Sequence, residues 1–301
     1  MKKLILFGKV CIYDGITFFI KDQGCIDHIL SNEKKYNLQF SYLKYGDSLV
    51  SRFVGKYKNM SISSIRGGIR IGGSLHKWKN ENHNYDTFYW NEFLSVYQEI
   101  VEEFKFDPSQ ARISSLEGGL NNVLPEHFKF KAKDFPINTI LLMGDPKISN
   151  RQKYSNDGYS LTISKGECKY KIYDKGSQFK LVHEIVRTEC SCKKRPLFKH
   201  GLAAFEDLLD YSNHFSYAKF LLKAFNSLII FQPDVLEGHN LPEQDRVFLS
   251  ALNNSRHWIE IRKKSDYQFK KNINRYFSLI QEYSPINYRA ELLTIMESQL
   301  Y

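Results

Sequence analysis

The feature that most constrains the fold is an alternation of apolar and polar residues that recurs through the first two thirds of the chain. Apolar side chains occupy every second position of short segments that are rich in β-branched and aromatic residues. This period of two is typical of strands with one buried face. The segments that show it are 16–20, 36–42, 62–71, 111–120, 159–164, 170–176 and 185–192. The pattern predicts a sheet in this part of the protein.

Other segments have the three- and four-residue spacing of amphipathic helices. One runs from residue 86 to residue 106, with Asp86 or Thr87 as the expected N-cap and Pro108 just beyond its end. Helical segments then follow Pro196, at 202–209, 217–231, 243–252, 258–282 and 288–300. The sequence therefore predicts an α+β fold, a mainly antiparallel sheet with packed helices, in a domain of residues 1–235. A helical C-terminal region of residues 236–301 is expected to follow.

The charge of the chain favours a polyanionic partner. Lysine and arginine number 43 against 33 aspartates and glutamates, which gives a net charge of +10. Only +2 of this falls in residues 241–301, so the basic field belongs mainly to the sheet. Plain solubility is the competing explanation for a basic chain. The four apolar residues after Lys3 are too few for a signal peptide, and no segment has the length of a membrane span, so we expect no membrane contact.

The five cysteines form no pattern of a metal site. They are odd in number and lack a C-x-x-C pair, and the histidines include neither H-x-H nor H-E-x-x-H. Cys190 and Cys192 are spaced to point to one face of a strand. We expect all five to be free thiols in a reducing compartment, without structural zinc.

Two glutamates in separate strand segments are candidate ligands of a divalent cation. Glu117 is expected to share a face with Ile113, Ser115 and Gly119, beside two glycines that allow close approach of a ligand. Glu189 shares a face with Arg187 in the segment 185–192. Each motif also has a plain structural explanation: a strand glutamate is usually solvated, and Arg187 and Glu189 could form an exposed ion pair.

Tyrosines and lysines lie between these two motifs. Tyr159 opens one strand segment, and Lys171, Tyr173 and Lys175 alternate in the next. A tyrosine hydroxyl beside a cation and a lysine is a competent nucleophile toward a phosphodiester. The same interleaving of aromatic and basic residues would serve stacking of single-stranded bases without catalysis.

The glycine-rich segment 67–78 ends in His76, Lys77 and Trp78. Its glycines match neither a Walker loop nor a dinucleotide-binding fingerprint. These three side chains are candidate DNA contacts at the end of a strand. A glycine-rich hairpin with a packed tryptophan is the alternative.

Taken in order, G-S-L-H-K at 73–77, L-E-G at 116–118, K-I-Y-D-K-G at 171–176 and V-R-T-E at 186–189 resemble motifs of the rolling-circle replication initiators of phages and plasmids. The resemblance covers residues 65–210 and is closest to the filamentous-phage gene II type and the Rep_trans plasmid type. It implies an initiator-type endonuclease core with a ferredoxin-like sheet.

The resemblance also implies roles for individual residues. Glu117 and Glu189 would hold Mg²⁺ or Mn²⁺, with His76 as a third ligand, and Tyr159 would attack the DNA with Lys175 near the phosphate. Lys77, Trp78, Lys171, Tyr173 and Arg187 would contact DNA. The partner would be a single-stranded or hairpin replication origin, with host polymerase and helicase, in the cytoplasm of a bacterial host cell.

Two other functions fit the same residues. A non-catalytic DNA-binding replication factor would bind DNA in a salt-sensitive way and form no covalent adduct. A hydrolytic nuclease would use the paired carboxylates to activate water and would need no tyrosine.

Overall fold

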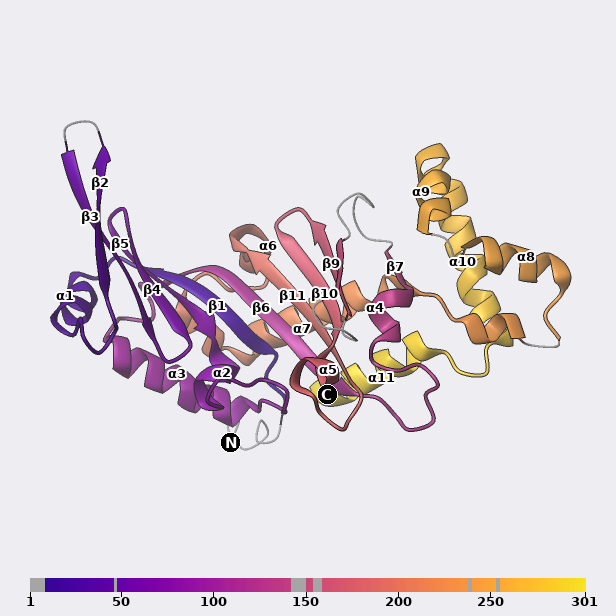
Figure 1. Ribbon diagram of the computed structural model, residues 1–301, viewed down its shortest axis with the longest axis horizontal. Helices are drawn as coiled ribbons and strands as arrows, with labels where there is room; N and C mark the ends of the chain where they lie inside the picture. Colours follow the sequence, from indigo (N-terminus) through magenta and orange to yellow (C-terminus); the bar gives the residue numbers. More distant parts are fainter. Residues whose placement is uncertain (1–8, 46–47, 142–149, 154–158, 238–239, 253–254) are drawn as a thin grey trace.

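A single ten-stranded antiparallel sheet organises the first part of the molecule (Figure 1). The computed structural model describes residues 9–45, 48–141, 150–153, 159–237, 240–252 and 255–301. The strand order is β2-β3-β4-β5-β1-β6-β11-β10-β9-β8. The strands are β1 Tyr13–Ile20, β2 Gln39–Tyr45, β3 Ser48–Tyr57, β4 Met60–Ile65, β5 Gly68–Ser74, β6 Arg112–Val123, β8 Asn150–Lys153, β9 Tyr159–Lys165, β10 Cys168–Asp174 and β11 Ile185–Lys193. β7 (Thr139–Leu141) and β12 (Leu228–Ile230) form a separate pair.

Two of the longer helices cover one face of the sheet. Shorter helices lie between the strands along the chain, and further helices follow the last strand of the sheet. Tyr13 of β1 packs on Phe93 of α3 and on Tyr217 of α7, which places both helices on the same face. The helices are α1 Gln23–Ser31, α2 Leu75–Lys79, α3 Trp90–Phe104, α4 Asp134–Asn138, α5 Lys175–Phe179, α6 Lys194–Phe198, α7 Tyr211–Asn226, α8 Glu243–Leu252, α9 Ser255–Lys264, α10 Asp266–Tyr283 and α11 Tyr288–Leu300. The predicted α+β fold, with a large antiparallel sheet and a helical C-terminal region, is confirmed. None of the described helices combines the length and the apolar character that crossing a bilayer requires.

Several predicted elements are divided or shifted in the structure. The segment 62–71 is a hairpin of β4 and β5 rather than one strand, and 202–209 contains a 3-10 helix, Phe205–Leu209. The segment 217–231 ends its helix at Asn226 and continues as β12. The segment 258–282 is broken at Ser265, whose hydroxyl accepts the Gln268 N–H at 3.2 Å as the N-cap of α10.

Helix α3 begins later than the sequence predicted. Its first residue is Trp90, and Tyr89 rather than Asp86 or Thr87 is the N-cap. The capping interaction comes from Glu92, whose carboxylate accepts the Tyr89 N–H at 2.9 Å. The preceding segment therefore stays outside the helix, and Asn84 and Asp86 are free to bond across to the sheet.

Strand β6 contains a bulge that resets its alternation. Thr17 pairs with Ser115 but Phe18 pairs with Ile113, so Ser114 is the extra residue. Ile113 is consequently buried on the helix-covered face, while Ser115 and Glu117 keep the opposite one. The predicted common face of Ile113 and Glu117 is therefore wrong, because simple alternation does not allow for the bulge.

Two hydrophobic cores divide the buried residues. The larger lies between the sheet and its helices and includes Tyr288, Leu292, Met296 and Leu300 of α11. The smaller joins α8, α9 and α10 to residues 229–235 and is centred on Trp258. The last helix thus returns to the sheet after the smaller core is complete. The predicted division at residues 235 and 236 stays a prediction.

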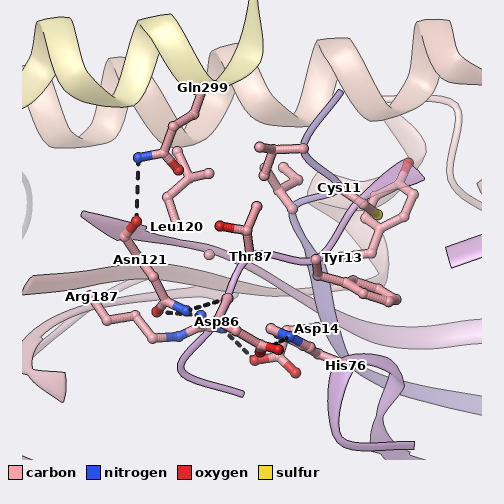
Figure 2. Close-up of a pocket in the computed structure, with 14 residues that line it drawn as sticks. Cys11, Tyr13, Asp14, His76, Asp86, Thr87, Leu120, Asn121, Arg187 and Gln299 are labelled. Carbon is pink, nitrogen blue, oxygen red and sulfur yellow. Dashed lines mark hydrogen bonds and ion pairs between the residues drawn. The ribbon is translucent and has the colours of Figure 1, made fainter. Parts of the chain in front are cut away.

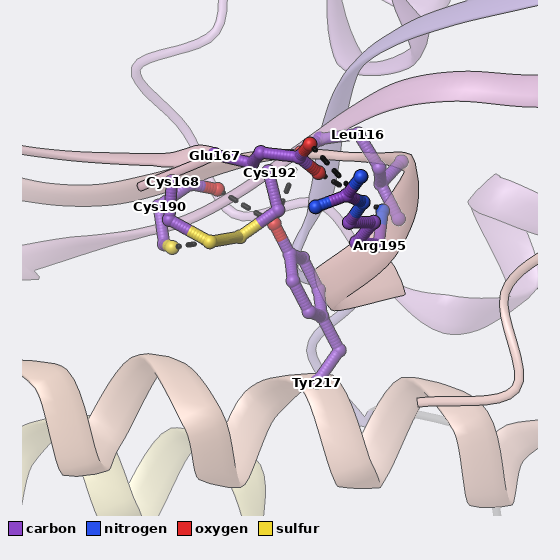
Figure 3. The surroundings of a disulfide bond; sticks show 7 residues. All are labelled: Leu116, Glu167, Cys168, Cys190, Cys192, Arg195 and Tyr217. Carbon is purple, nitrogen blue, oxygen red and sulfur yellow. Dashed lines mark hydrogen bonds and ion pairs between the residues drawn. A yellow bond between two sulfur atoms is a disulfide. The ribbon is translucent and has the colours of Figure 1, made fainter. Parts of the chain in front are cut away.

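The cysteines depart from the expectation of free thiols. Cys168 of β10 lies directly opposite Cys192 of β11, with 4.3 Å between their Cα atoms, and a disulfide joins them (Figure 3). Cys11, Cys25 and Cys190 are free and buried. The prediction of five free thiols is wrong because a pairing across two strands depends on their register. The shared face of Cys190 and Cys192 is confirmed, since their sulfur atoms are 3.6 Å apart.

The position of α11 in the larger core gives a test of stability. We expect Leu292→Ala to lower the free energy of unfolding of the sheet by about 2–5 kcal/mol, since Leu292 is fully buried and its loss leaves a cavity. Urea unfolding, followed by circular dichroism, measures this. Glu297→Ala on the exposed side of the same helix is the control. Equal stability of the two variants would contradict the packing of α11 on the sheet.

Candidate active site

Three carboxylates from neighbouring strands meet on the face of the sheet that α3 and α7 leave open. They are Asp14 of β1, Glu117 of β6 and Glu189 of β11, and one ligand oxygen from each lies within 4.8 Å of the others. Asp14 and Glu189 are buried, and Glu117 is half-buried. We call these residues the carboxylate cluster. The predicted pairing of Glu117 with Glu189 is present in the structure, and Asp14 joins it.

Glycines make room for the carboxylate cluster. Gly119 lies opposite Glu189 in the β6–β11 register, and a Cβ at Gly119 would be 2.9 Å from the Glu189 side chain and 3.0 Å from Arg187. A Cβ at Gly15 would be 3.2 Å from the Cβ of Glu117. Any side chain at Gly119 would displace the charged groups. The close approach expected at this glycine is therefore made by the protein's own side chains.

Arg187 lies beneath the carboxylate cluster and is 2% exposed. Its Nε donates to Glu189 at 2.6 Å. Its Nη1 donates to Asn121 at 2.9 Å, and its Nη2 bonds Asp14 (Figure 2). Burial lowers the pKa of a guanidinium, but Asp14 and Glu189 raise that of Arg187 above its ordinary value. The exposed ion pair considered from the sequence is in fact a buried one. A direct DNA contact by Arg187 is incompatible with this burial.

Lys171 bridges the two glutamates. Its Nζ lies 3.2 Å from Glu117 and 3.3 Å from Glu189, and its side chain is 35% exposed. Burial acts to lower the pKa of this lysine, but the charges of Glu189 and Glu117 together outweigh burial. The net pKa is raised above its ordinary value, so the ammonium is retained. Lys171 thus supplies a positive charge at the open side of the carboxylate cluster.

The two glutamates differ in their affinity for a proton. Burial and the neighbouring Glu189 raise the pKa of Glu117, although Lys171 opposes them. Burial also acts to raise the pKa of Glu189, but Arg187 and Lys171 lower it below its ordinary value. Glu117 is therefore the carboxyl group that takes a proton first when no other cation is present.

Tyr173 and Lys175 adjoin the carboxylate cluster. The Tyr173 hydroxyl donates to Glu189 at 2.8 Å, and the Nζ of Lys175 lies 3.4 Å from the same hydroxyl. Lys175 also donates to Asn84 at 2.7 Å, and Asn84 donates to Asp14 at 2.8 Å. Tyr173 therefore bonds one of the three carboxylates directly and is connected to a second, Asp14, through Lys175 and Asn84.

The environment changes the acidity of both groups. Burial and then the Glu189 carboxylate raise the pKa of Tyr173 well above its usual range. Burial and then the charge of Arg187 lower the pKa of Lys175 to about 7, although Glu189 opposes them. A substantial fraction of Lys175 is consequently a neutral amine near neutral pH.

Tyr159, the predicted nucleophile, is the first residue of β9 and pairs with Lys153 of β8. In the β9–β10 register Ser160 lies opposite Tyr173. The side chain of Tyr159 is outside the described part of the structure. Its role in catalysis stays a prediction.

The three residues at the end of the glycine-rich segment have different surroundings. His76 lines a small cavity with Asp14 and Arg187 (Figure 2), but its Nε2 bonds Asp86 at 2.7 Å. Burial lowers its pKa, so the ring is neutral near pH 7. The structure does not bring His76 into the carboxylate cluster. Lys77 follows on α2, with its N–H bonded to Ser74 as part of the helix cap.

Trp78 lies in the hydrophobic core and is 4% exposed. Its indole N–H donates to Glu99 at 2.9 Å, and its ring packs on Tyr57. The predicted DNA contact by Trp78 is incompatible with this burial, and the alternative of a packed tryptophan holds.

Asp14 and Asn84 are functional candidates that the sequence analysis missed. Asp14 interrupts an otherwise apolar run, C-I-Y-D-G-I, and a charged residue inside such a run is a signal of a buried polar site. Asn84 gives no comparable signal, because it belongs to a polar segment that the helix prediction did not reach.

The chain was compared with protein families, with curated proteins and with solved structures. No family model and no curated protein sequence matches the chain. Its structure is similar to the solved structure of the rolling circle replication initiator protein from Geobacillus stearothermophilus, over 81% of this chain and 96% of that one. The sequence identity is 13% and the TM-score is 0.41.

The buried ion pairs of Arg187 give a prediction of stability. We expect Arg187→Met to lower the free energy of unfolding by about 3–5 kcal/mol, because two buried carboxylates lose their partner. Arg195→Met is the control, and we expect its effect to be within about 0.5 kcal/mol, because the Arg195 side chain is 88% exposed. Urea unfolding at constant pH measures both. A loss of under about 1 kcal/mol in Arg187→Met would contradict the proposed role of the guanidinium.

The lowered pKa of Lys175 gives a prediction of pH dependence. The unfolded chain binds this proton more tightly than the folded protein, so the unfolding free energy rises as the pH increases above about 7. Between pH 7 and pH 9 we expect the wild-type protein to gain about 2 kcal/mol more than Lys175→Met, which has no such proton. Urea unfolding at several pH values measures the difference. Parallel curves for the two proteins would show that Lys175 keeps an ordinary pKa.

Proposed function

We propose that the protein initiates rolling-circle replication by nicking and rejoining single-stranded DNA at the carboxylate cluster. The observation that supports this most is the convergence of two separate motifs on one site. Glu189 of the R-x-E segment and Tyr173 of the K-I-Y-D-K-G segment share a hydrogen bond, and Glu117 of the glycine-bearing strand lies beside them. The order of these motifs along the chain resembles the initiator family.

The donor set of the cluster fits Mg²⁺ or Mn²⁺. All three candidate ligands are carboxylates, and hard divalent cations prefer such oxygen ligands. Burial raises the pKa of Glu117 most and the Glu189 charge adds to it, and a bound cation would oppose both effects by favouring the ionised carboxylate. We propose Asp14, Glu117 and Glu189 as the ligands, with Lys171 moving from the glutamates toward a DNA phosphate. When bound, the cation would polarise a phosphoryl oxygen and stabilise the charge that develops on it.

We propose Tyr173 as the nucleophile, because it is the tyrosine whose described hydroxyl lies at the carboxylates. Its oxygen attacks the scissile phosphorus, and the bond from phosphorus to the 3′ oxygen breaks. The hydroxyl proton passes to the neutral amine of Lys175, and the 3′ oxygen leaves as a hydroxyl after taking a proton from solvent water. The products are a 5′-phosphotyrosine and a free 3′-OH, and the reverse reaction rejoins a strand.

This proposal extends to the partners of the protein. The DNA would be a single-stranded or hairpin origin, held by the basic sheet domain, and host polymerase would extend the 3′-OH in the bacterial cytoplasm. A host helicase would be a further partner.

The nucleophile is tested by trapping the covalent adduct. A label at the 5′ end of the origin oligonucleotide would leave with the fragment that carries the free 3′-OH. The label is therefore placed at the 3′ end, where it stays with the phosphotyrosine. We expect wild-type protein with Mn²⁺ to form a labelled band on denaturing gels and Tyr173→Phe to form none, because the attacking oxygen is absent. Tyr159→Phe is the matched variant for the sequence-based prediction. Its adduct should persist.

Each result of this experiment has a defined meaning. An adduct in Tyr173→Phe that is lost in Tyr159→Phe would assign the nucleophile to Tyr159. Cleavage without an adduct in all three proteins would contradict the tyrosine mechanism and favour the hydrolytic nuclease. Chelation of the metal by EDTA should abolish the adduct, and an undiminished adduct would overturn the proposed metal site.

A further inference from the structure

A second cavity lies on the opposite face of the sheet from the carboxylate cluster. Tyr170 and Lys171 are successive residues of β10, so their side chains point to opposite faces. Lys171 reaches the glutamates, whereas Tyr170 lines a cavity of about 470 Å³ between β10, α6 and α7. This volume is within the range of about 300–1,000 Å³ that is usual for sites of small ligands. The cavity has no part in the nicking reaction proposed above.

Three cationic side chains border this cavity. They are Arg195 of α6, Lys199 just after α6, and Lys223 of α7, and all three are exposed. Glu167 is the acidic residue of the lining. It accepts the backbone N–H of Arg195 at 3.1 Å, and the Nε of the Arg195 guanidinium lies 3.9 Å from it (Figure 3). Within the described part of the chain, no ion pair joins Lys199 or Lys223 to a carboxylate. Two ammonium groups at one opening are therefore available to an anion.

Aromatic rings form the wall of the same cavity. The ring centroids of His200 and Phe220 are 5.0 Å apart, and those of Tyr170 and Phe220 are 6.1 Å apart. The hydroxyl of Ser216 lies 2.9 Å from Nδ1 of His200 and fixes the orientation of that ring. Phe220 and His200 are half-buried, so part of each ring borders the cavity. Such faces stack on the planar bases of nucleic acids.

We propose that this cavity binds a nucleotide, with the phosphate at Lys199 and Lys223 and the base against Phe220 and His200. The combination of free ammonium groups with partly open rings matches the two halves of a nucleotide, one anionic and one planar. The ligand has two sources with this chemistry, an unpaired nucleotide of a bound single strand and a free mononucleotide. A strand that reaches this site passes over the face of the sheet that carries α7, away from the carboxylates.

Binding is tested with two probes on the full-length protein. The first is dAMP, followed by isothermal titration calorimetry, and the second is a fluorescent single-stranded oligonucleotide without origin sequence, followed by anisotropy. We expect Lys199→Glu combined with Lys223→Glu to weaken the binding of at least one probe about tenfold or more, which corresponds to about 1.4 kcal/mol. The charge-matched control is Lys34→Glu combined with Lys105→Glu, two exposed lysines in other parts of the chain. Circular dichroism confirms that both variants fold.

The base is tested separately from the phosphate. Phe220→Leu keeps an apolar side chain but removes the ring. We expect this variant to bind dAMP more weakly than the wild-type protein and to bind inorganic phosphate with unchanged affinity. Loss of dAMP binding in the lysine variant would identify a free nucleotide, and loss of oligonucleotide binding alone would identify a nucleotide of a strand. Equal affinity of the lysine variant and its control for both probes would overturn the proposal. Binding of inorganic phosphate as tightly as dAMP would also overturn the proposal, because the base would then add nothing to the affinity.

This test stands apart from the nicking reaction. The lysine variant retains every residue of the carboxylate cluster, Tyr173 and Lys175. It should form the covalent adduct on a short origin oligonucleotide at the wild-type rate, whether or not the cavity binds a nucleotide. Failure of one proposal is therefore distinguishable from failure of the other.

Discussion

The pairing of Arg187 with Asp14 and Glu189 is the interaction on which the candidate active site depends. Three carboxylates on adjacent strands repel one another, and two of them are removed from water. A buried guanidinium between two of these groups offsets their negative charge, because it supplies charge and directed donors together. The sheet can then carry acidic residues on its central strands β1, β6 and β11. A lysine in place of Arg187 could not bond Asn121, Asp14 and Glu189 in the same way.

The two lysines of the site have opposite electrostatic roles. Lys171 stays charged and lies at the partly exposed side of the cluster, where an incoming cation or phosphate would compete for it. Lys175 is buried close to Arg187 and is drawn toward its neutral form. Residues four apart in one short segment thus provide a positive charge and a proton acceptor. The difference comes from burial and neighbours, since the two side chains are chemically the same.

Much of the fold was predictable from the sequence because alternation and helical periodicity are local properties. Strands β6, β9, β10 and β11 and helices α8 and α11 lie where the pattern predicted them. The bulge at Ser114 was not predictable, since it depends on the pairing of β6 with β1. The late start of α3 was not predictable either, since Tyr89 forms a β-bridge with the distant Val10. For the same reason the disulfide between Cys168 and Cys192 required the register of β10 and β11.

The candidate site was likewise predictable only in part. Glu117 and Glu189 were identified because each lies in a segment with a recognisable pattern, and the structure brings them together. Asp14 and Asn84 were missed, because their place at the site follows from the order of strands and from a segment that joins α2 to α3. Trp78 and Arg187 were assigned to DNA although they are buried, since sequence alone does not reveal which polar or aromatic residues the fold covers.

The return of α11 to the sheet has a mechanical consequence for α8, α9 and α10. These helices lie between two anchored segments, because α7 precedes them and α11 follows them in the larger core. A segment held at both ends cannot swing away as a terminal appendage would. These three helices are therefore kept at a bounded distance from the carboxylates, and α11 forms one side of that tether.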